Sequence, residues 1–451
     1  MNNKCNKIFK NKKYVHFDVR KNPDNNLIKK IKNPNWIEHH AFYPFIHYII
    51  KSNKTISDID GRNNIRKNRE IYYSSHIDRY IYQYYGYQLN NQYNKIAKKY
   101  GINKASIAYR NTFKGKCNIH FAKEVIDFIS KQKLAFVYVS DFSKFFDQLN
   151  HKYLKEKLCQ TLECDKLPND HYKVYKSIVN FTYVERDDIL SYKNIDINEF
   201  NNLDSIFDTT KEFQMFKHKY LKKHTNSDYR KLKIGIPQGS SISSVYSNIY
   251  MIDFDKQLND YVTSNKGLYR RYCDDIVIVI PIKNNIYEYN KHIEKINSIT
   301  KSIPNLNMND KKTFKFIFKD KIFTEIDGKS KKSFNYLGFY FDGKKVLIRD
   351  KSLYKYYSRL YEKLETVCKY TSSYNRKVFR KKLYNLYSHL GAYPSKNSQK
   401  HFGNFLTYAY KSYEVFGTDN NYENFIKKQV ARHWKKINNI LKKCDSKLKH
   451  D

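Results

Sequence analysis

The sequence has few residues that break, bend or cross-link a chain: its 451 residues include 8 prolines, 13 glycines and 7 cysteines. The cysteines are scattered, without a CxxC pair or a histidine cluster at zinc-ligand spacing, so we expect no structural zinc site and a reducing cytoplasm. No apolar run is long enough for a membrane-spanning helix, and residues 1–13 are polar and rich in lysine. We therefore expect neither a secretory signal nor a membrane partner.

Acidic residues are also scarce. The chain has 85 Lys and Arg against 44 Asp and Glu, a formal net charge of +41. A gene poor in G and C would explain the many lysines and asparagines, but it would not explain the shortage of acids. Because hydrophobic residues still make up 40% of the chain, we expect a folded protein. Its expected partner is a polyanion, in the first place a nucleic acid, with a membrane surface as the weaker alternative.

Two short apolar runs predict buried strands, and each lies next to acidic residues. Residues 134–141 read LAFVYVSD and end on Asp141. Residues 276–280 read IVIVI and follow directly on YCDD at 272–275. Between them, residues 243–258 have apolar side chains at helical spacing. Strand, helix and strand-turn-strand in this order predict an α+β fold.

The flanking regions have other patterns. The tyrosine-rich segments 71–89 and 94–113 are expected to be helical, and the C-terminal region has apolar helical stripes laced with lysine. An insertion at about 160–230 has no role that the pattern identifies. We divide the chain into three regions: 1–133, 134–345 and 346–451.

The acids near the two strands predict a metal site. Adjacent carboxylates such as Asp274 and Asp275 repel each other, and a divalent cation would neutralise them. Mg²⁺ prefers carboxylate, phosphate and water oxygens. Asp141, at the end of the other strand, also needs a partner. The alternatives are an exposed acidic turn for YCDD and a helix N-cap for Asp141.

A segment of small residues, GIPQGSSISS at 235–244, precedes the helical pattern. Small side chains let the backbone of a substrate come close. A flexible loop without function is the alternative.

The ordered set DFSKFFD, GIPQGSSIS, YCDD, LNMNDKKT (306–313) and YLGF (336–339) resembles motifs A to E of reverse transcriptases, over about 134–340. The resemblance implies a right-hand polymerase with fingers, a palm and an all-α basic thumb. It implies an RNA-directed DNA polymerase that extends a 3′ end with dNTPs by two-metal catalysis, with Mg²⁺ or alternatively Mn²⁺. Motif B and the terminal thumb resemble bacterial abortive-infection and other antiphage defence reverse transcriptases, especially the second polymerase of type-3 defence systems.

The resemblance also assigns roles residue by residue. Asp141 and Asp274 match the ligands of both metal ions, and Asp275 matches the third acid. Phe146 matches the steric gate that favours dNTPs over NTPs, with core packing as the alternative. Lys312 matches a lysine near the pyrophosphate that could act as general acid, with an ordinary solvated lysine as the alternative.

Further matches concern substrate and primer. The expected substrate contacts are Gln238, Gly239 and Tyr272. The expected primer grip is Leu337, Gly338 and Phe339. The fingers match less well, because we find no basic pair on an antiparallel hairpin before Asp141. Triphosphate contact is therefore assigned to Arg110, together with Lys114 and Lys116.

Three functions fit these observations. The first is an active polymerase that copies a noncoding RNA in bacterial antiphage defence. The second is template-independent or protein-primed DNA synthesis at the same site. The third is a non-catalytic RNA-binding scaffold, which would not need all three acids. The expected partners are an RNA template, the DNA product and dNTPs, and a second reverse transcriptase subunit or a second copy of the chain could join them.

Overall fold

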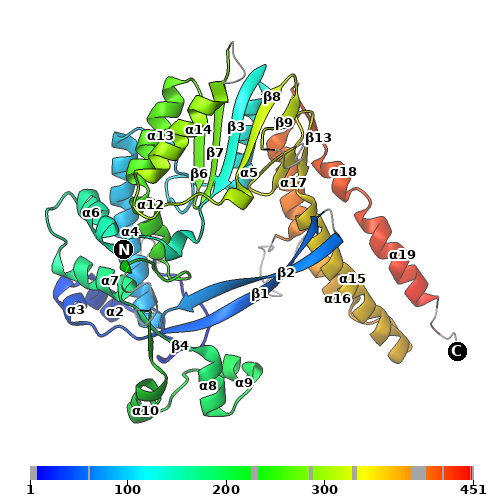
Figure 1. Cartoon of the computed structure of the whole chain (residues 1–451). Helices are drawn as coiled ribbons and strands as arrows, with labels where there is room; N and C mark the ends of the chain where they lie inside the picture. The colour runs from blue at the N-terminus through cyan, green and yellow to red at the C-terminus, as the bar shows by residue number, and fades with distance from the viewer. Residues whose placement is uncertain are drawn as a thin grey trace.

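A five-stranded antiparallel sheet forms the centre of the molecule (Figure 1). The computed structural model describes residues 8–58, 61–224, 232–283, 288–327, 333–387, 403–418, 421–446 and 448, without the side chains of 52–67. In spatial order, the strands are β6 (Leu268–Tyr272), β7 (Asp275–Pro281), β3 (Leu134–Asp141), β8 (Phe314–Lys319) and β9 (Ile322–Glu325). Both predicted strands are confirmed, and they are direct neighbours in which Asp141 lies opposite Asp275.

Helices cover both faces of this sheet, which explains why its central strands are apolar on both sides. Ile276 and Ile278 belong to the same core as the helices of one face, and Val277 and Val279 to the core of the other. The helices are α12 (Ser243–Tyr250), α13 (Ile252–Ser264) and α14 (Tyr289–Lys301) on the first face and α5 (Asn118–Ser130) on the second. The single helix predicted over 243–258 is wrong in one respect, because Met251 separates α12 from α13.

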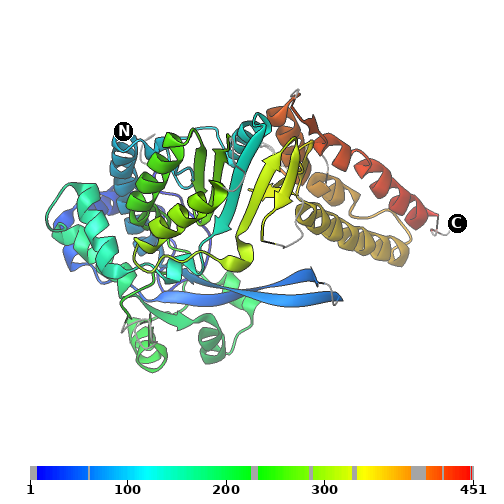
Figure 2. The ribbon, with the colours of Figure 1, turned by 45° about the horizontal axis from the view of Figure 1, so that its top comes forward.

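A second sheet contains a long hairpin that crosses the open side of the central sheet (Figures 1 and 2). Its strands are β2 (Gly61–Tyr73), β1 (Phe45–Asp58), β4 (Thr182–Glu185) and β5 (Lys222–Lys223), in this order. The hairpin consists of β1 and β2. The helix predicted over 71–89 is therefore wrong at its start, because residues 71–73 pair with residues 46–48 as strand.

Helix α4 (His76–Lys99) follows the hairpin and packs against α6 (His151–Leu162) and α12. Ser75 caps its N-terminus by accepting a hydrogen bond from the backbone N–H of Asp78 at 3.2 Å. The helix predicted over 94–113 is wrong beyond Lys99. Gly101, with φ +72°, follows the last turn and leads into the short 3₁₀ helix η1 (Ile102–Lys104).

The insertion at about 160–230 completes the fingers. It contains α7 (Asn169–Val179), β4, α8 (Arg186–Lys193), α9 (Ile197–Asn202), α10 (Thr210–Tyr220) and β5. Strand β4 pairs in parallel with β1, so that the insertion continues the sheet of the hairpin. Val184 and Phe216 of the insertion share a small core with Phe17 and Ile46 of the N-terminal region.

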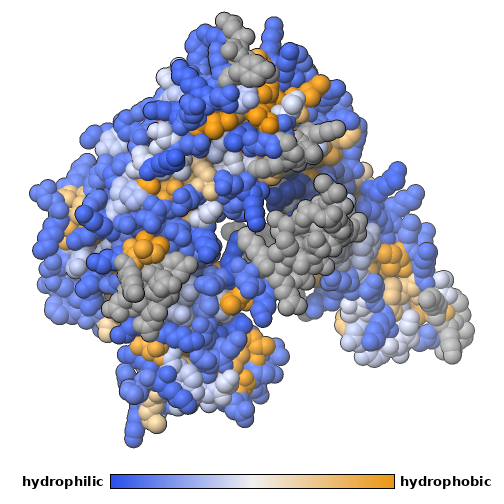
Figure 3. All heavy atoms as spheres, in the orientation of Figure 1, coloured by the Kyte–Doolittle hydropathy of each residue, from blue (hydrophilic) through white to orange (hydrophobic). Residues whose placement is uncertain are grey.

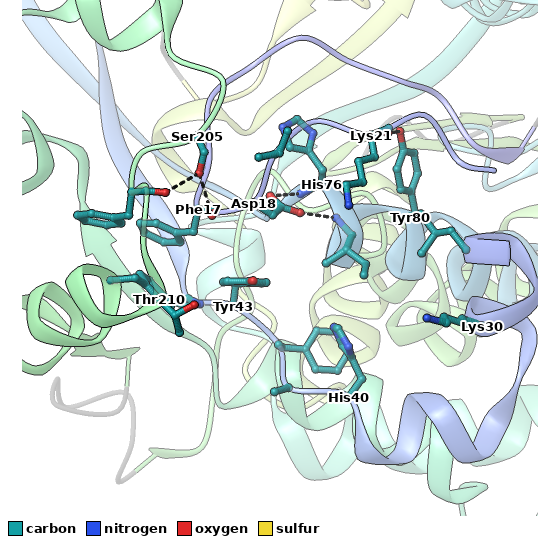
Figure 4. A pocket seen from close by; sticks show the side chains of 18 of the residues that line it. Phe17, Asp18, Lys21, Lys30, His40, Tyr43, His76, Tyr80, Ser205 and Thr210 are labelled. Atoms are coloured by element: carbon teal, nitrogen blue, oxygen red, sulfur yellow. Dashed lines mark hydrogen bonds between the residues drawn. The ribbon is translucent and has the colours of Figure 1, made fainter.

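The N-terminal segment, with α2 (Asn25–Lys32) and α3 (Pro34–His39), anchors the base of the hairpin. The Asp18 carboxylate accepts hydrogen bonds from the backbone N–H groups of His76 and Ile77, each at 2.9 Å (Figure 4). A hollow of about 860 Å³ lies here, bounded by the N-terminal segment, the start of α4 and residues 205–217. The N-terminal segment thus binds the residues that follow β2 directly, and the residues that precede β1 line the same hollow.

The C-terminal region shares one core with α5 and with the face of the central sheet that α5 covers. A small sheet, β10 (Phe334–Tyr336), β11 (Phe339–Phe341), β12 (Lys345–Ile348) and β13 (Glu423–Asn424), leads into it. Its helices are α15 (Asp350–Ser373), α16 (Arg380–Tyr387), α17 (Phe405–Phe416), α18 (Ile426–Val430) and α19 (His433–Asp445). Apart from the two-residue strand β13, the described part of this region that follows β12 is helical, and α15 and α19 project away from the sheet (Figure 1).

The arrangement is that of a right hand: a palm sheet with fingers on one side and a helical thumb on the other (Figure 2). On the face drawn in Figure 3, hydrophilic side chains cover most of the described surface, and hydrophobic ones gather in small separate patches. Within the described ranges, no helix is both long and apolar enough to cross a bilayer.

Candidate active site

A cleft of about 870 Å³ lies between the palm sheet and the fingers hairpin. Five residues predicted from the sequence line it: Asp141, Phe146, Gln238, Asp274 and Lys312. Basic residues of the fingers and of the motif A turn line it as well: Arg69, Lys144, Lys222 and Lys223. The structure therefore brings together, from β3, β7, the motif B loop and the fingers, residues far apart in the sequence.

Two carboxylates lie at neighbouring strand ends in the cleft. Asp141 ends β3 and is 8% exposed. The backbone N–H of Phe142 donates to the carbonyl of Asp274 at 3.3 Å, which ties the two segments together. The ammonium group of Lys312 forms an ion pair with the Asp141 carboxylate. Lys312 is thus a cleft residue that balances the charge of an acid, rather than a lysine surrounded only by solvent.

The third predicted acid lies differently. Asp275 is the register partner of Asp141 but is exposed, and it does not line the cleft. In the described part of the chain, no three His, Cys, Asp or Glu side chains are grouped closely enough to hold a metal ion. Two carboxylates in one cleft still fit Mg²⁺, which proteins usually hold with one or two carboxylates together with substrate phosphates and water. Asp141 and Asp274 are the residues that would hold it.

A buried ion pair supports the YCDD turn from below. Arg271 and Asp255 are both fully buried, and the guanidinium donates to the carboxylate twice, at 2.6 and 2.8 Å. Arg271 also donates to the carbonyl of Cys273 at 3.0 Å, inside the turn that carries Asp274. This pair was not predicted from the sequence. The available signal was the pair of arginines, Arg270 and Arg271, in the segment just before YCDD.

The motif B loop is clamped to the fingers hairpin. The backbone N–H of Tyr72 donates to the carbonyl of Gln238 at 2.9 Å. Gly239 has φ +125°, and a Cβ there would lie 2.5 Å from the carbonyl oxygen of Tyr72. Gly239 does not line the cleft. Its predicted substrate contact is therefore replaced by a backbone role: it lets the loop approach β2 so that Gln238 can face the cleft.

Two of the three phenylalanines of motif A, Phe145 and Phe146, have different environments. Both line the cleft, but Phe145 is 5% exposed and belongs to the core, whereas Phe146 is half-buried. Their ring centroids are 5.5 Å apart in an edge arrangement. The backbone N–H of Ile236 donates to the carbonyl of Phe146 at 2.9 Å, so motif B fixes its position. Phe146 is thus a cleft wall supported by the core.

The structure corrects the prediction for Arg110. Its side chain is buried, and its guanidinium donates to Asn94, Asn103 and the carbonyl of Ser106 at 2.6 to 3.0 Å. Arg110 holds together the loop after α4 and does not line the cleft. Lys114 and Lys116, the other two predicted triphosphate contacts, do not line the cleft either. A buried, fully engaged arginine cannot reach a triphosphate.

The fingers hairpin supplies the basic residue instead. Strand β2 brings Asn68, Arg69 and Glu70 to the cleft, opposite the palm carboxylates. The hairpin was missed because its strands are rich in Lys, Arg and Asn, which are weak strand formers. The signal that could have found it is the Asp-Gly pair at 60–61, a sequence typical of hairpin turns, between the apolar residues of 45–50 and those of 71–73.

The predicted primer grip forms the turn between β10 and β11. Leu337 and Gly338 have φ of +46° and +94°, and the carbonyl of Leu337 accepts a hydrogen bond from the Asn118 side chain at 3.0 Å. Phe339 is fully buried, with its ring 5.0 Å from that of Phe416 in the thumb. Leu337 and Gly338 thus form the tip of the turn, and Phe339 anchors the turn in the core. Contact of this tip with a primer strand stays a prediction.

Tyr272 also lies outside the cleft: it is half-buried, with its ring 6.4 Å from that of Phe121. Because Tyr272 is not among the residues that line the cleft, its predicted contact with the substrate stays a prediction.

An acid that the sequence analysis did not single out, Asp147, lines the cleft opposite Glu70. Although Asp147 is exposed, partial desolvation by the walls of the cleft and the negative charge of Glu70 raise its pKa to about 6, against the lowering effect of Lys144. The cleft therefore contains a carboxyl group that titrates close to neutral pH.

The fold and the cleft define a right-hand polymerase, and the family follows from comparison. The chain belongs to the reverse transcriptase (RNA-dependent DNA polymerase) family, whose model matches residues 93–341. No match was found among curated proteins.

The solved structures similar to this chain include telomerases. One is telomerase from Candida tropicalis without its C-terminal domain, at 14% identity and TM-score 0.37, covering 65% of this chain and 53% of that one. Another is telomerase from Candida albicans with a fragment of telomeric RNA, at 16% identity and TM-score 0.38, covering 72% of this chain and 48% of that one. The chain spans about half the length of these telomerases.

Proposed function

We propose that this protein is an RNA-directed DNA polymerase that extends a nucleic-acid 3′ end with dNTPs. The observation that carries the proposal is the pair Asp141 and Asp274, placed by neighbouring antiparallel strands in one cleft with Phe146 and Gln238, in a chain of the reverse transcriptase family. The net charge of +41 supports a nucleic-acid substrate.

The reaction joins the 3′ oxygen to the α-phosphorus and breaks the bond to the β-phosphate, so that pyrophosphate leaves. When bound, two Mg²⁺ ions would lower the pKa of the 3′ hydroxyl and neutralise charge on the transferred phosphate. Asp141 and Asp274 would hold them. Arg69 and Lys223 line the same cleft and would bind the triphosphate. The ring of Phe146 would exclude a ribose 2′-hydroxyl.

Lys312 would give a proton to the leaving pyrophosphate. Its ion pair with Asp141 supports this role, because the ammonium group lies inside the cleft beside that carboxylate.

The test is incorporation of labelled dNTP or NTP by the purified protein on a DNA primer annealed to RNA, with Mg²⁺. We expect dNTP incorporation that falls at least about 100-fold in Asp141→Asn and in Asp274→Asn, because each removes a metal ligand worth several kcal/mol in the transition state. Lys114→Gln, outside the cleft, is the control.

Three outcomes separate the functions. Incorporation that needs the RNA supports templated synthesis, and incorporation without it supports untemplated or protein-primed synthesis at the same site. Absence of incorporation by a folded protein that still binds nucleic acid would refute the polymerase and leave an RNA-binding scaffold.

We further propose a role in bacterial antiphage defence, supported by the resemblance of GIPQGSSIS to motif B of defence reverse transcriptases. Phages should then form fewer plaques on cells that express the protein than on cells that express the Asp274→Asn variant. Equal plaque counts across a broad set of phages would contradict this role.

A further inference from the structure

A basic hollow of about 520 Å³ lies beside the cleft on the fingers side. It is formed by α6, α7, the β4 and β5 pair and the segment that enters motif B. Its basic residues are His151, Lys155, Lys176, Lys223, His224 and Lys233. No carboxylate is among the described residues that line it. Burial lowers the pKa of both histidines, so the positive charge of the hollow comes from its four lysines.

These lysines are available to a ligand. None of Lys155, Lys176, Lys223 and Lys233 forms an ion pair with a carboxylate in the part of the chain that the structure describes. Lys222, on the other face of β5, is different, because it lies near Glu185 and Asp188. Four uncompensated lysines in one concave surface attract phosphate groups.

The hollow also has an aromatic wall. Tyr172 is 38% exposed, and its ring lies 6.2 Å from that of Tyr175 at an interplanar angle of 20°. The ammonium groups of Lys155 and Lys176 lie 5.0 and 5.5 Å from the centre of the Tyr172 ring. An exposed aromatic ring beside several lysines is the combination that binds single-stranded nucleic acid, because the ring stacks on a base and the lysines bind phosphates.

The hollow is continuous with the cleft. Lys223 and His224 line both. A Cβ at Gly235 would lie 3.0 Å from Nε2 of His224, and the ring of His151 donates to the carbonyl of Gly235 at 2.7 Å. The hollow therefore abuts the loop that presents Gln238 to the cleft.

The position of the hollow fixes which strand it would receive. The primer grip and the thumb lie on one side of the carboxylates, where a finished duplex has to leave. The fingers lie on the other side, ahead of the growing 3′ end, where the template is still unpaired. This step rests on the proposed polymerase function.

The larger hollow at the base of the hairpin does not share these properties (Figure 4). Three acids, Asp18, Asp24 and Asp208, line it together with Lys21, Lys30 and Lys217, so its charge is balanced. It has no lining residue in common with the cleft.

We propose that the basic hollow is a binding site for the unpaired template strand, with Tyr172 stacking on a base and Lys155 and Lys176 binding its phosphates. The insertion, which supplies α7 and β5, thus has a role in holding the template ahead of synthesis.

The test compares RNA templates annealed to one DNA primer, with either a single unpaired template nucleotide or about twelve. Affinity is measured by fluorescence anisotropy, without turnover, for wild type and for Lys155→Glu/Lys176→Glu. The matched control is Lys152→Glu/Lys173→Glu, which makes the same charge change on the same two helices outside the hollow.

We expect the wild type to bind the long overhang more tightly than the short one, and the hollow variant to lose about tenfold or more with the long overhang only. The control should keep the difference between the two overhangs. Tyr172→Ala, which leaves the charge unchanged, should weaken binding of the long overhang about tenfold. The same variant should have little effect on a long overhang made of abasic nucleotides.

Equal losses with both overhangs, or the same losses in the control, would overturn the proposal. Because anisotropy needs no turnover, a protein that incorporates no nucleotide but shows the overhang dependence would refute the polymerase while leaving this site in place.

Discussion

Replacing Asp255 with asparagine should destabilise the protein by about 3 to 5 kcal/mol, because it leaves the guanidinium of Arg271 buried without a counter-charge. Both side chains are 0% exposed. Asparagine has nearly the shape of aspartate, so packing is conserved. The change removes the charge and replaces one of the two oxygens that accept from Arg271 with an NH2 donor. Tyr269, whose hydroxyl donates to the Asp255 carboxylate at 2.7 Å, keeps an acceptor in the amide oxygen.

The assay is urea unfolding followed by far-UV circular dichroism. The control lies on the same helix: Asp260 pairs with Lys256 at 2.6 Å, but both side chains are about half exposed. Asp260→Asn should therefore cost less than about 1 kcal/mol. Since Arg271 also donates to the carbonyl of Cys273, Asp255→Asn should reduce nucleotide incorporation even where the protein is still folded.

A loss below about 1 kcal/mol in Asp255→Asn, or a loss equal to that of Asp260→Asn, would refute the reasoning. It would mean that the guanidinium finds water or another acceptor, and that the turn carrying Asp274 does not depend on the pair.

Three further predictions follow from the site. Gly239→Ala should cost roughly 1 to 3 kcal/mol in urea unfolding, because its Cβ would clash with the carbonyl of Tyr72, whereas Gly101→Ala, with nothing within 4 Å, should cost only the left-handed strain of about 1 kcal/mol. The folded-state pKa of Asp147 is raised from 3.8 to about 6, so ionisation of this carboxyl group destabilises the fold. Relative to Asp147→Asn, the melting temperature of the wild type should fall between pH 4 and 6 and then stay level. Melting temperatures of the two proteins that change in parallel over this range would refute the prediction. Arg69→Ala should raise the KM for dNTP about tenfold or more, while Lys114→Ala should not; equal effects would contradict the fingers assignment.

The sequence by itself determined the palm. Residues 134–141 and 276–280 are β-branched and aromatic runs, and such runs form strands wherever both faces can be buried. The acids at their ends follow from the same local pattern. Five of the predicted site residues line the cleft. Short motifs next to these strands, on the motif B loop and just before β8 fix the positions of Asp141, Phe146, Gln238, Asp274 and Lys312.

Only the tertiary structure decided the fingers. Residues 71–73 have no local preference strong enough to exclude a helix, and they become strand because β1 pairs with them and with β4, more than a hundred residues further along the chain. This pairing places Arg69 in the cleft, while burial removes Arg110 from it. The partner of Arg271 was decided by the tertiary structure for the same reason. A charge is tolerated in a core only where an opposite charge meets it, and the contact with Asp255 is a property of the folded chain.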